Sequence, residues 1–354
     1  MQAVALRRGS SSPELVEKPR PVPDAGEALV RTLRVGVDGT DHEILAGHHG
    51  EFPADADHLV LGHEAVGVVA DANGTALSEG DVVVPTVRRP PADGPTEWFD
   101  RGQPDMAPPD ETVERGISGA HGFMSEFFTS PVEYLVPIPA DLAEWGFLVE
   151  PVSVAEKALE LADASRSSFD WRPESALVLG NGSLGLLALA MLDDRFERTY
   201  CLGRRDRPDP TVDVIEALGG TYVDSRETPV STVPDVHEPM DLVFEATGYA
   251  RHAFESIDAL APNGVAALLG VPDSWTFEVD GGDLHRELVM TNKALVGSVN
   301  SGYRHFEAAV ETLADLPSWL LDDLVTEVAD LENLDRAFAD DETTIKTAVK
   351  FDNQ

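Results

Sequence analysis

The chain has 354 residues, of which 26 are lysine or arginine and 64 are aspartate or glutamate, giving a formal net charge of −38. This charge excludes general nucleic-acid binders and proteins of anionic membrane surfaces, because polyanions would repel the chain. The hydrophobic content of 42% excludes a disordered polymer, and the length predicts two domains that each bury a core.

Two features of the composition concern the environment of the protein. Acidic residues occur in nearly every surface-like stretch, as in proteins of salt-accumulating halophiles, where molar salt screens repulsion to within about 3 Å. An acidic protein that binds basic partners is the alternative interpretation.

The single cysteine, Cys201, excludes a disulfide framework. Residues 1–8 lack a secretory signal, and polar residues interrupt the apolar segment 176–192, so we predict a cytoplasmic protein without a membrane span.

The first part of the chain is rich in short β-like runs. They occupy residues 2–6, 28–37, 59–70, 81–87, 123–129 and 134–138, and glycine and proline separate them, as in a small barrel. Residues 88–119 form a proline- and aspartate-rich stretch without a hydrophobic period. The stretch is too long for an ordinary connection, so we predict either a mobile lid or an excursion with a function.

The pattern changes after Pro151, where a helix is predicted to begin. Strands are predicted at 176–179, 199–202, 242–245, 265–270 and 294–299, with helices at 183–192, 212–218 and 253–260. This alternation predicts an α/β fold with a doubly wound parallel sheet. An amphipathic helix from residue 303 and a strand at 345–351 end the chain, and this tail can return to the first domain.

A glycine-rich motif follows the apolar strand at 176–179 and precedes a predicted helix. It reads Gly180-Asn181-Gly182-Ser183-Leu184-Gly185. In this context the first glycine makes the turn, the second lets the backbone approach a pyrophosphate, and the third lets the helix pack on the strand. A glycine-rich loop without a ligand is the alternative. We predict a dinucleotide site with further contacts from later strand ends at Thr247, Gly248, Gly270, Val271, Ser298 and Asn300.

The end of the second strand of this domain predicts the choice of coenzyme. The chain reads Gly203-Arg204-Arg205-Asp206 where an acid would bond the ribose hydroxyls of NAD. Guanidinium groups bond phosphate oxygens in pairs, so Gly203, Arg204 and Arg205 favour the 2′-phosphate of NADP, with NAD as the alternative. The two arginines could instead be merely solvated, and Asp206 could reach the ribose.

A second set of motifs lies in the first domain and carries a family resemblance. Gly62-His63-Glu64 opens a GHExxG motif, and a segment containing Asp38 precedes it. Together with GxGxxG at this distance, the motif resembles zinc-dependent medium-chain alcohol dehydrogenases over essentially the full chain. The resemblance implies a GroES-like β-barrel catalytic domain of residues 1–164 and 303–354, and a Rossmann NADP-binding domain of residues 165–302.

The resemblance also implies one catalytic zinc site. His63 matches the zinc-binding histidine, Asp38 stands where the family usually has cysteine, and Glu150 is the third ligand, which the family supplies from near the start of the linking helix. An aspartate in a turn usually only stabilises the turn. Two carboxylates and an imidazole together, however, suit Zn²⁺ and leave its fourth coordination position for water or substrate. A carboxylate is a harder ligand than a thiolate, so Asp38 in place of cysteine favours an oxygen-rich coordination shell. Glu64 is expected as an exchangeable ligand or as a carboxylate directly behind the ligands.

Two departures from the family pattern are visible. The four cysteines of the structural zinc lobe are absent after Val87, so no structural zinc is expected. The family's relay histidine is replaced by Glu43, with His42 beside it. Thr40 stands where the family has its relay hydroxyl, and the proton path beyond Thr40 stays open.

Within the family, the chain is similar to the glucose dehydrogenases of archaea, and its acidity to those of halophiles. The similarity rests on segments 87–90, 114–117, 121–126, 134–139 and 295–300. It implies oxidation of β-D-glucose at C1 to glucono-1,5-lactone with NADP⁺ in a non-phosphorylated Entner–Doudoroff route. It further implies sugar contacts from Thr40, Glu114, Glu150 and Asn300, although Glu114 could also be a solvated loop residue.

Residue pattern alone reaches only an NADP-linked, zinc-assisted dehydrogenase of a polar substrate. A polyol or secondary-alcohol dehydrogenase is one alternative, and a non-catalytic nucleotide-binding relative is another. The joint presence of Asp38, His63 and Glu150 argues against the second alternative. Members of the family are dimers or tetramers, and without a structural zinc lobe we expect a homodimer.

Overall fold

The computed structural model describes residues 1–339, 341 and 343–351, and the chain divides into two compact units. The first unit is Met1–Ser153 with Asn300–Gln354, and the second is Val154–Val299. Helix α3 (Val149–Arg166) contains the first boundary. The domain limits expected from the sequence, 164/165 and 302/303, stay a prediction. Residues 352–354, which belong to the predicted catalytic domain, lie outside the described residues.

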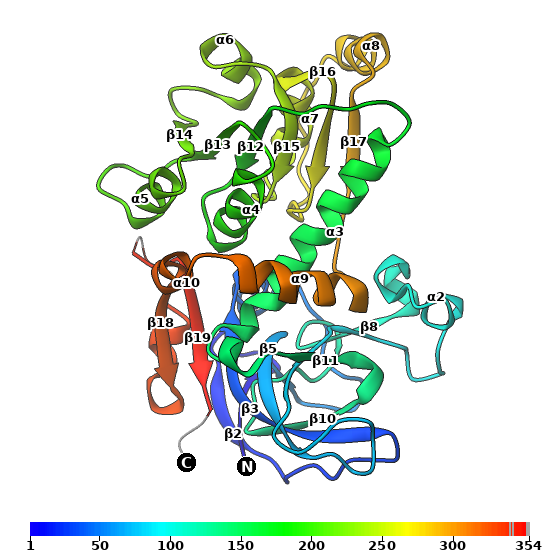
Figure 1. Ribbon diagram of the computed structural model, residues 1–354. Coiled ribbons are helices and arrows are strands. Elements are labelled where there is room, and N and C mark those ends of the chain that lie inside the picture. The colour runs from blue at the N-terminus through cyan, green and yellow to red at the C-terminus, as the bar shows by residue number, and fades with distance from the viewer. Residues whose placement is uncertain (340, 342, 352–354) are drawn as a thin grey trace. The chain divides into compact units, whose positions relative to one another are not determined.

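The first unit is built on a seven-stranded sheet (Figure 1). Its order is β11-β6-β5-β3-β19-β18, β10 also pairs with β3, and only the β18–β19 pair is parallel. The strands are β3 (Glu27–Val37), β5 (Glu64–Asp71), β6 (Val82–Pro85), β10 (Phe127–Pro131), β11 (Leu135–Ile138), β18 (Val325–Asp330) and β19 (Lys346–Lys350). The C-terminal strand β19 pairs with β3, which confirms that the tail returns to the first unit.

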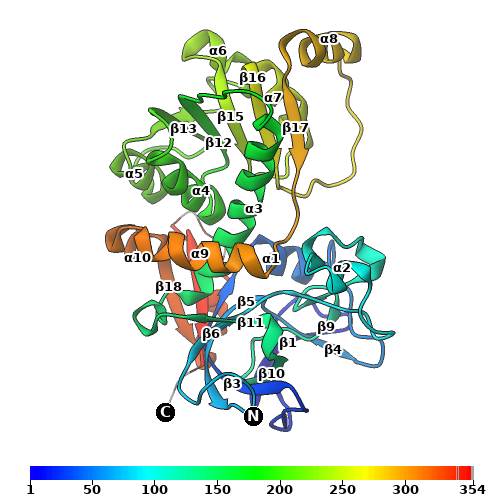
Figure 2. The same ribbon diagram turned by 45° about the vertical axis from the view of Figure 1, so that its right-hand side comes forward.

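Two smaller sheets and five helices complete the first unit. The sheets are β2 (Glu14–Glu17), β1 (Gln2–Arg7) and β4 (His58–Val60), and β7 (Arg88–Arg89), β8 (Val113–Arg115) and β9 (Gly119–Ala120). The helices are α1 (Gly39–Ala46), α2 (Glu97–Asp100), α9 (Tyr303–Asp315), α10 (Ser318–Leu324) and α11 (Leu334–Ala337). Helix α9 contacts β11, and α10 contacts β18 (Figure 2).

The single strand predicted at residues 59–70 is wrong, because the chain turns between β4 and β5. Gly62 has φ of +83°, and a Cβ there would lie 2.5 Å from the Met124 side chain. Glycine is therefore required for conformation and for space. The strand predicted at 123–129 begins only at Phe127, because the preceding backbone bonds to this turn, with the Phe123 amide donating to Gly62 O at 2.9 Å.

The proline-rich stretch is an excursion between paired strands. It holds α2 and the 3₁₀ turns η1 (Pro104–Met106) and η2 (Pro109–Glu111). Strands β7 and β8 pair at its base, with Arg88 opposite Glu114. This pairing brings Glu114, a predicted sugar contact, beside a buried arginine.

The second unit contains a six-stranded parallel sheet with the order β14-β13-β12-β15-β16-β17 (Figure 1). Its strands are β12 (Ser175–Leu179), β13 (Arg198–Gly203), β14 (Thr221–Asp224), β15 (Met240–Glu245), β16 (Leu260–Leu268) and β17 (Ala294–Gly297). Its helices are α4 (Ser183–Asp193), α5 (Pro210–Ala217), α6 (Val233–Val236), α7 (Ala250–Ala259) and α8 (Gly281–Thr291). The predicted doubly wound α/β sheet is confirmed. Its strand order reverses between β12 and β15, where such sheets bind ligands.

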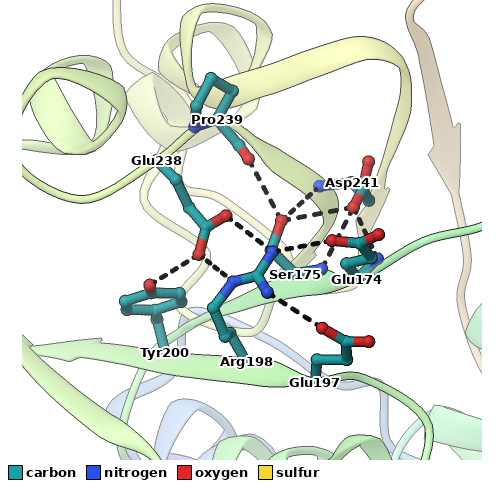
Figure 3. A network of polar contacts seen from close by, with 8 residues as sticks. All are labelled: Glu174, Ser175, Glu197, Arg198, Tyr200, Glu238, Pro239 and Asp241. Carbon is teal, nitrogen blue, oxygen red and sulfur yellow. Dashed lines mark hydrogen bonds and ion pairs between the residues drawn. The ribbon is translucent and has the colours of Figure 1, made fainter.

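A polar network joins the amino-terminal ends of β12, β13 and β15 (Figure 3). Arg198 pairs with three carboxylates, those of Glu174, Glu197 and Glu238, and the Tyr200 hydroxyl donates to Glu238 at 2.8 Å. The glycine-rich turn lies at the opposite, carboxyl-terminal end of β12, so this network supports the sheet and not a ligand. Among the described residues, no helix has both the length and the apolar character needed to cross a lipid bilayer.

Candidate active site

Asp38 is held in place by the start of helix α1. Its Oδ1 accepts the Asp41 amide at 3.0 Å, and Asp41 Oδ2 accepts the Asp38 amide at 3.3 Å, which forms a reciprocal capping box. The Thr40 hydroxyl donates to Asp38 Oδ2 at 3.0 Å. Local sequence therefore orients Asp38, and its Oδ2 lies 3.5 Å from His63 Nε2.

His63 and Glu64 follow the glycine turn and enter strand β5. Gly36 lies opposite Glu64 in the pairing of β3 with β5. A Cβ at Gly36 would collide with the Glu64 carboxylate, so glycine leaves the space that this side chain occupies. Glu150 comes from the first turn of α3, where an acid is favoured by the helix dipole.

These side chains converge around His63. The ligand atoms of His63, Glu64 and Glu150 lie within 4.8 Å of one another, and so do those of His63, Asp38 and Asp41. His63, Glu64 and Glu150 are 4%, 1% and 6% exposed. The structure thus brings together all four predicted metal residues and adds Asp41, which we did not predict.

The buried carboxyl groups shift one another's acidity. Burial raises the pKa of Glu150 to about 8 and that of Asp41 to about 7. Burial would also raise the pKa of Asp38, but the opposing charge of His63 contributes to an overall lowering below its ordinary range. Placing several carboxylates close together among buried side chains costs folding free energy unless a cation compensates their charge.

Lys346, which begins β19, supplies part of that compensation. It is 1% exposed and forms an ion pair with Glu64. Four carboxyl groups, those of Asp38, Asp41, Glu64 and Glu150, lie near this one ammonium, and a divalent cation would further compensate the carboxylates that are ionised. Nδ1 of His63 is buried without a hydrogen-bond partner among the described residues, while Nε2 faces the carboxylates. The donor set therefore fits a Zn²⁺ ion in an oxygen-rich site.

Two of the predicted sugar contacts lie together in the first unit. Asn300 Nδ2 donates to Glu114 Oε1 at 3.2 Å, and Arg88 Nε donates to the same oxygen at 3.0 Å. Asn300 adopts a left-handed conformation, with φ of +56°, which asparagine tolerates better than most residues. Glu114 is thus not an isolated loop acid, because two polar groups hold it.

The glycine-rich turn has the geometry that its motif predicts. Gly180 has φ of +107°, and a Cβ at Gly185 would collide with Gly180 O, so glycine allows helix α4 to approach the strand. A Cβ at Gly182 would meet nothing within 4 Å, which leaves open space at the start of the helix. Ser183 and Leu184 form the first turn of α4, whose amides are available to an anion.

Glu245 organises the other predicted coenzyme contacts and was missed in the sequence. Its buried carboxylate ends β15 and accepts the amides of Thr247 at 2.7 Å, Gly248 at 3.0 Å and Gly270 at 3.2 Å. Three predicted contacts remain: Val271 is 74% exposed, Ser298 is buried, and Asn300 donates to Glu114. An acid that ends an apolar strand could have been recognised as a support for the following loop.

The predicted coenzyme-choice residues follow β13. Arg204 is exposed and forms no ion pair with a described residue, and Arg205 Nε lies 3.9 Å from Asp209 Oδ2. Asp206 is exposed and pairs with Arg226 at 2.6 Å. A Cβ at Gly203 would lie 2.5 Å from Asn181 Oδ1. Asn181 therefore depends on glycine at position 203, and Nδ2 of Asn181 donates to Thr211 at 2.5 Å.

Comparisons with known proteins identify the family. The model of the alcohol dehydrogenase GroES-like domain matches residues 24–140, and that of the glucose dehydrogenase C-terminus matches residues 143–351. Glucose 1-dehydrogenase of Haloferax mediterranei is 67% identical over 354 residues, with 99% of each chain covered. Glucose 1-dehydrogenase of Haloarcula marismortui is 62% identical over 353 residues, with 100% of each chain covered.

Solved structures agree with these relatives. Haloferax mediterranei glucose dehydrogenase in complex with NADP, Zn and gluconolactone has a TM-score of 0.99 and 66% identity, with 100% of each chain covered. A 2R,3R-butanediol dehydrogenase from Bacillus subtilis, 21% identical with a TM-score of 0.81 and 99% of each chain covered, shares the fold. The predicted resemblance is confirmed, and the chain belongs to the zinc-dependent medium-chain alcohol dehydrogenases, among their glucose 1-dehydrogenases.

Proposed function

We propose that the protein oxidises β-D-glucose at C1 to glucono-1,5-lactone and reduces NADP⁺, with one catalytic zinc ion and no structural zinc. The convergence of Asp38, Glu64 and Glu150 on His63, with all but Asp38 buried, carries this proposal. NADP is the preferred coenzyme, and NAD is the weaker one. The non-phosphorylated Entner–Doudoroff route is the pathway that we assign to the reaction.

The residues of the chain divide the work between two sites. Asp38, His63 and Glu150 would hold the metal, with Glu64 as an exchangeable or supporting carboxylate. When bound, Zn²⁺ supplies Lewis acidity at the sugar C1 hydroxyl, and the nicotinamide supplies the carbon that accepts the hydride. The catalytic domain predicted from the sequence, 1–164 with 303–354, contains the metal residues and the proposed sugar contacts other than Asn300, and 165–302 contains Asn300 and the coenzyme residues.

Thr40 and Glu114 have roles that their hydrogen bonds support. Thr40 Oγ1 can accept a hydrogen bond from the sugar hydroxyl, because its own proton already points toward Asp38 Oδ2 at 3.0 Å. Glu114 keeps 18% exposure of its side chain, so it can accept a hydrogen bond from a sugar hydroxyl. Glu150 and Asn300 complete the proposed sugar contacts.

A substrate panel tests the proposed function. A site that bonds several hydroxyls discriminates strongly against analogues that lack them. We expect kcat/KM for glucose to exceed that for butan-2-ol by at least about a thousandfold. Higher efficiency with butan-2-ol or with a polyol would support the related alcohol dehydrogenases instead. NADPH binding without turnover of any of these compounds would support a non-catalytic relative.

We also propose a homodimer in the cytoplasm. Among the described residues, β17 pairs only with β16, so its outer edge is open to another strand. Helix α8 immediately precedes β17 in the chain and has no buried residue, and its Val289 and Met290 are 62% and 73% exposed. A second copy paired along this edge would cover apolar side chains that a monomer leaves in water.

Low salt is expected to inactivate the protein. A net charge of −38 destabilises the compact state when nothing screens it. The melting temperature should therefore rise steadily from low to molar potassium chloride, and activity should follow it. A parallel series in sucrose controls for effects that come from solute exclusion alone. A melting temperature that is independent of potassium chloride would contradict the halophilic interpretation.

A further inference from the structure

Arg88 is a buried arginine to which the proposed chemistry assigns no role. It lies in β7 at the base of the excursion and is 4% exposed. Its Nη1 donates to the carbonyl oxygens of Pro104 and Asp105, both at 3.1 Å, and of Ala107 at 3.0 Å. Its Nε donates to Glu114 Oε1 at 3.0 Å. One guanidinium thus connects the η1 turn to a proposed sugar-binding carboxylate.

The two proposed sugar contacts and the η1 turn are connected through Arg88. Glu114 Oε1 accepts hydrogen bonds from both Arg88 and Asn300. Two residues after Asn300, Gly302 precedes helix α9, and a Cβ there would lie 2.7 Å from Asp105 Oδ1. Asp105 belongs to the turn that Arg88 holds. Arg88 therefore ties the η1 turn to Glu114 and, through Glu114, to Asn300, while Asp105 of the same turn leaves no room for a side chain at Gly302.

The two oxygens of the Glu114 carboxylate have different surroundings. Oε1 receives both internal hydrogen bonds, whereas Oε2 makes no hydrogen bond to a described residue. Fixing one oxygen sets the direction of the other, and preorganised acceptors bind a ligand without the entropic cost of ordering it. We propose that Arg88 is a positioning residue that aims Glu114 Oε2 at a sugar hydroxyl and ties this orientation to the η1 turn. This inference rests on the proposed sugar-binding role of Glu114.

Lysine cannot replace Arg88 in this role. The guanidinium donates from Nε and Nη1 in fixed, diverging directions, so it reaches the carboxylate and the three carbonyl groups at once. An ammonium is a compact point charge on a flexible stem. It can preserve the buried charge but not both sets of hydrogen bonds.

Arg88→Lys tests the proposal, and Arg89→Lys is its matched control. Arg89 is also buried, 8% exposed, but it donates to Thr86 and Ser130 and not to Glu114. We expect Arg88→Lys to raise KM for glucose at least about tenfold, with kcat and the KM for NADP⁺ changed much less. Arg89→Lys should leave KM for glucose close to that of the parent. Equal KM values for glucose in the two variants would overturn the proposal.

Two further measurements keep the proposal testable if Arg88→Lys folds poorly. Gly302→Ala introduces a Cβ against Asp105 Oδ1 and leaves Arg88 and Glu114 in place, so KM for glucose should rise. In the Glu114→Gln background, which itself should have a raised KM for glucose, Arg88→Lys or Gly302→Ala should add little, because each acts through that carboxylate. An unchanged KM in Gly302→Ala, or effects that add fully to Glu114→Gln, would overturn the positioning role. A parent enzyme without glucose turnover would instead contradict the proposed function.

Discussion

Asp38→Ala and His63→Ala are each expected to lower kcat/KM with glucose at least about a thousandfold, or about 4 kcal/mol of transition-state stabilisation. Each change removes a donor from one or both of the two groups that share His63, and within each group the ligand atoms lie within 4.8 Å of one another. Bound zinc should fall in parallel. NADPH binding should be retained, because its predicted contacts at the glycine-rich turn lie in the second unit.

His48→Ala is the matched control for these two variants. His48 is 61% exposed and pairs with Glu43, outside the set around His63. Zinc content by mass spectrometry and glucose-dependent NADPH formation should match the parent in this control. Near-parental turnover in zinc-free Asp38→Ala or His63→Ala would show that the metal has no part in the reaction.

The double variant Arg204→Ala/Arg205→Ala is expected to lower kcat/KM for NADP⁺ by more than tenfold and to leave NAD⁺ nearly unaffected. Each charge-assisted bond to the 2′-phosphate is typically worth about 1.5 to 3 kcal/mol, and molar salt reduces the charge contribution but not the fork geometry. Arg204 is exposed without an ion-pair partner among the described residues, which leaves it available to a phosphate. The measured quantity is the ratio of the two kcat/KM values at fixed salt.

Arg195→Ala is a suitable control for the loss of charge from the second unit, because Arg195 pairs with Asp163 at 2.9 Å. Adding Gly203→Asp should improve NAD⁺ only if Asn181 moves, since a Cβ at position 203 lies 2.5 Å from Asn181 Oδ1. A coenzyme ratio equal to that of the parent in the double variant would show that Arg204 and Arg205 only face solvent.

The parts of the fold that depend on local pattern were predictable. The glycine-rich turn lies between a strand and a helix that adjoin it in the sequence, and Gly180 and Gly185 have the conformations and contacts that the motif requires. The strand break at Gly62 was missed because apolar runs lie on both sides of it, although Gly62-His63-Glu64 itself interrupts the apolar pattern. The packing of the turn against Met124, which requires glycine at this position, is not visible in a hydrophobic pattern.

The support around the metal pocket was less predictable, because distant segments provide it. Lys346 reaches Glu64 only through the pairing of β19 with β3, and strand register cannot be derived from the sequence of either strand alone. Arg88 similarly reaches Glu114 through the pairing of β7 with β8. Asp41 is different, since the spacing of Asp38 and Asp41 is that of a capping box and could have been recognised.

We expect glucose oxidation in this protein to need the metal that Asp38, His63 and Glu150 are proposed to hold. Reduction of NADP⁺ with glucose in molar potassium chloride, before and after removal of the metal by a chelator, measures this requirement. We predict strong turnover before chelation, loss of turnover after it, and recovery on addition of Zn²⁺, with NADPH binding present throughout. Undiminished glucose oxidation by protein verified to be metal-free would contradict this expectation.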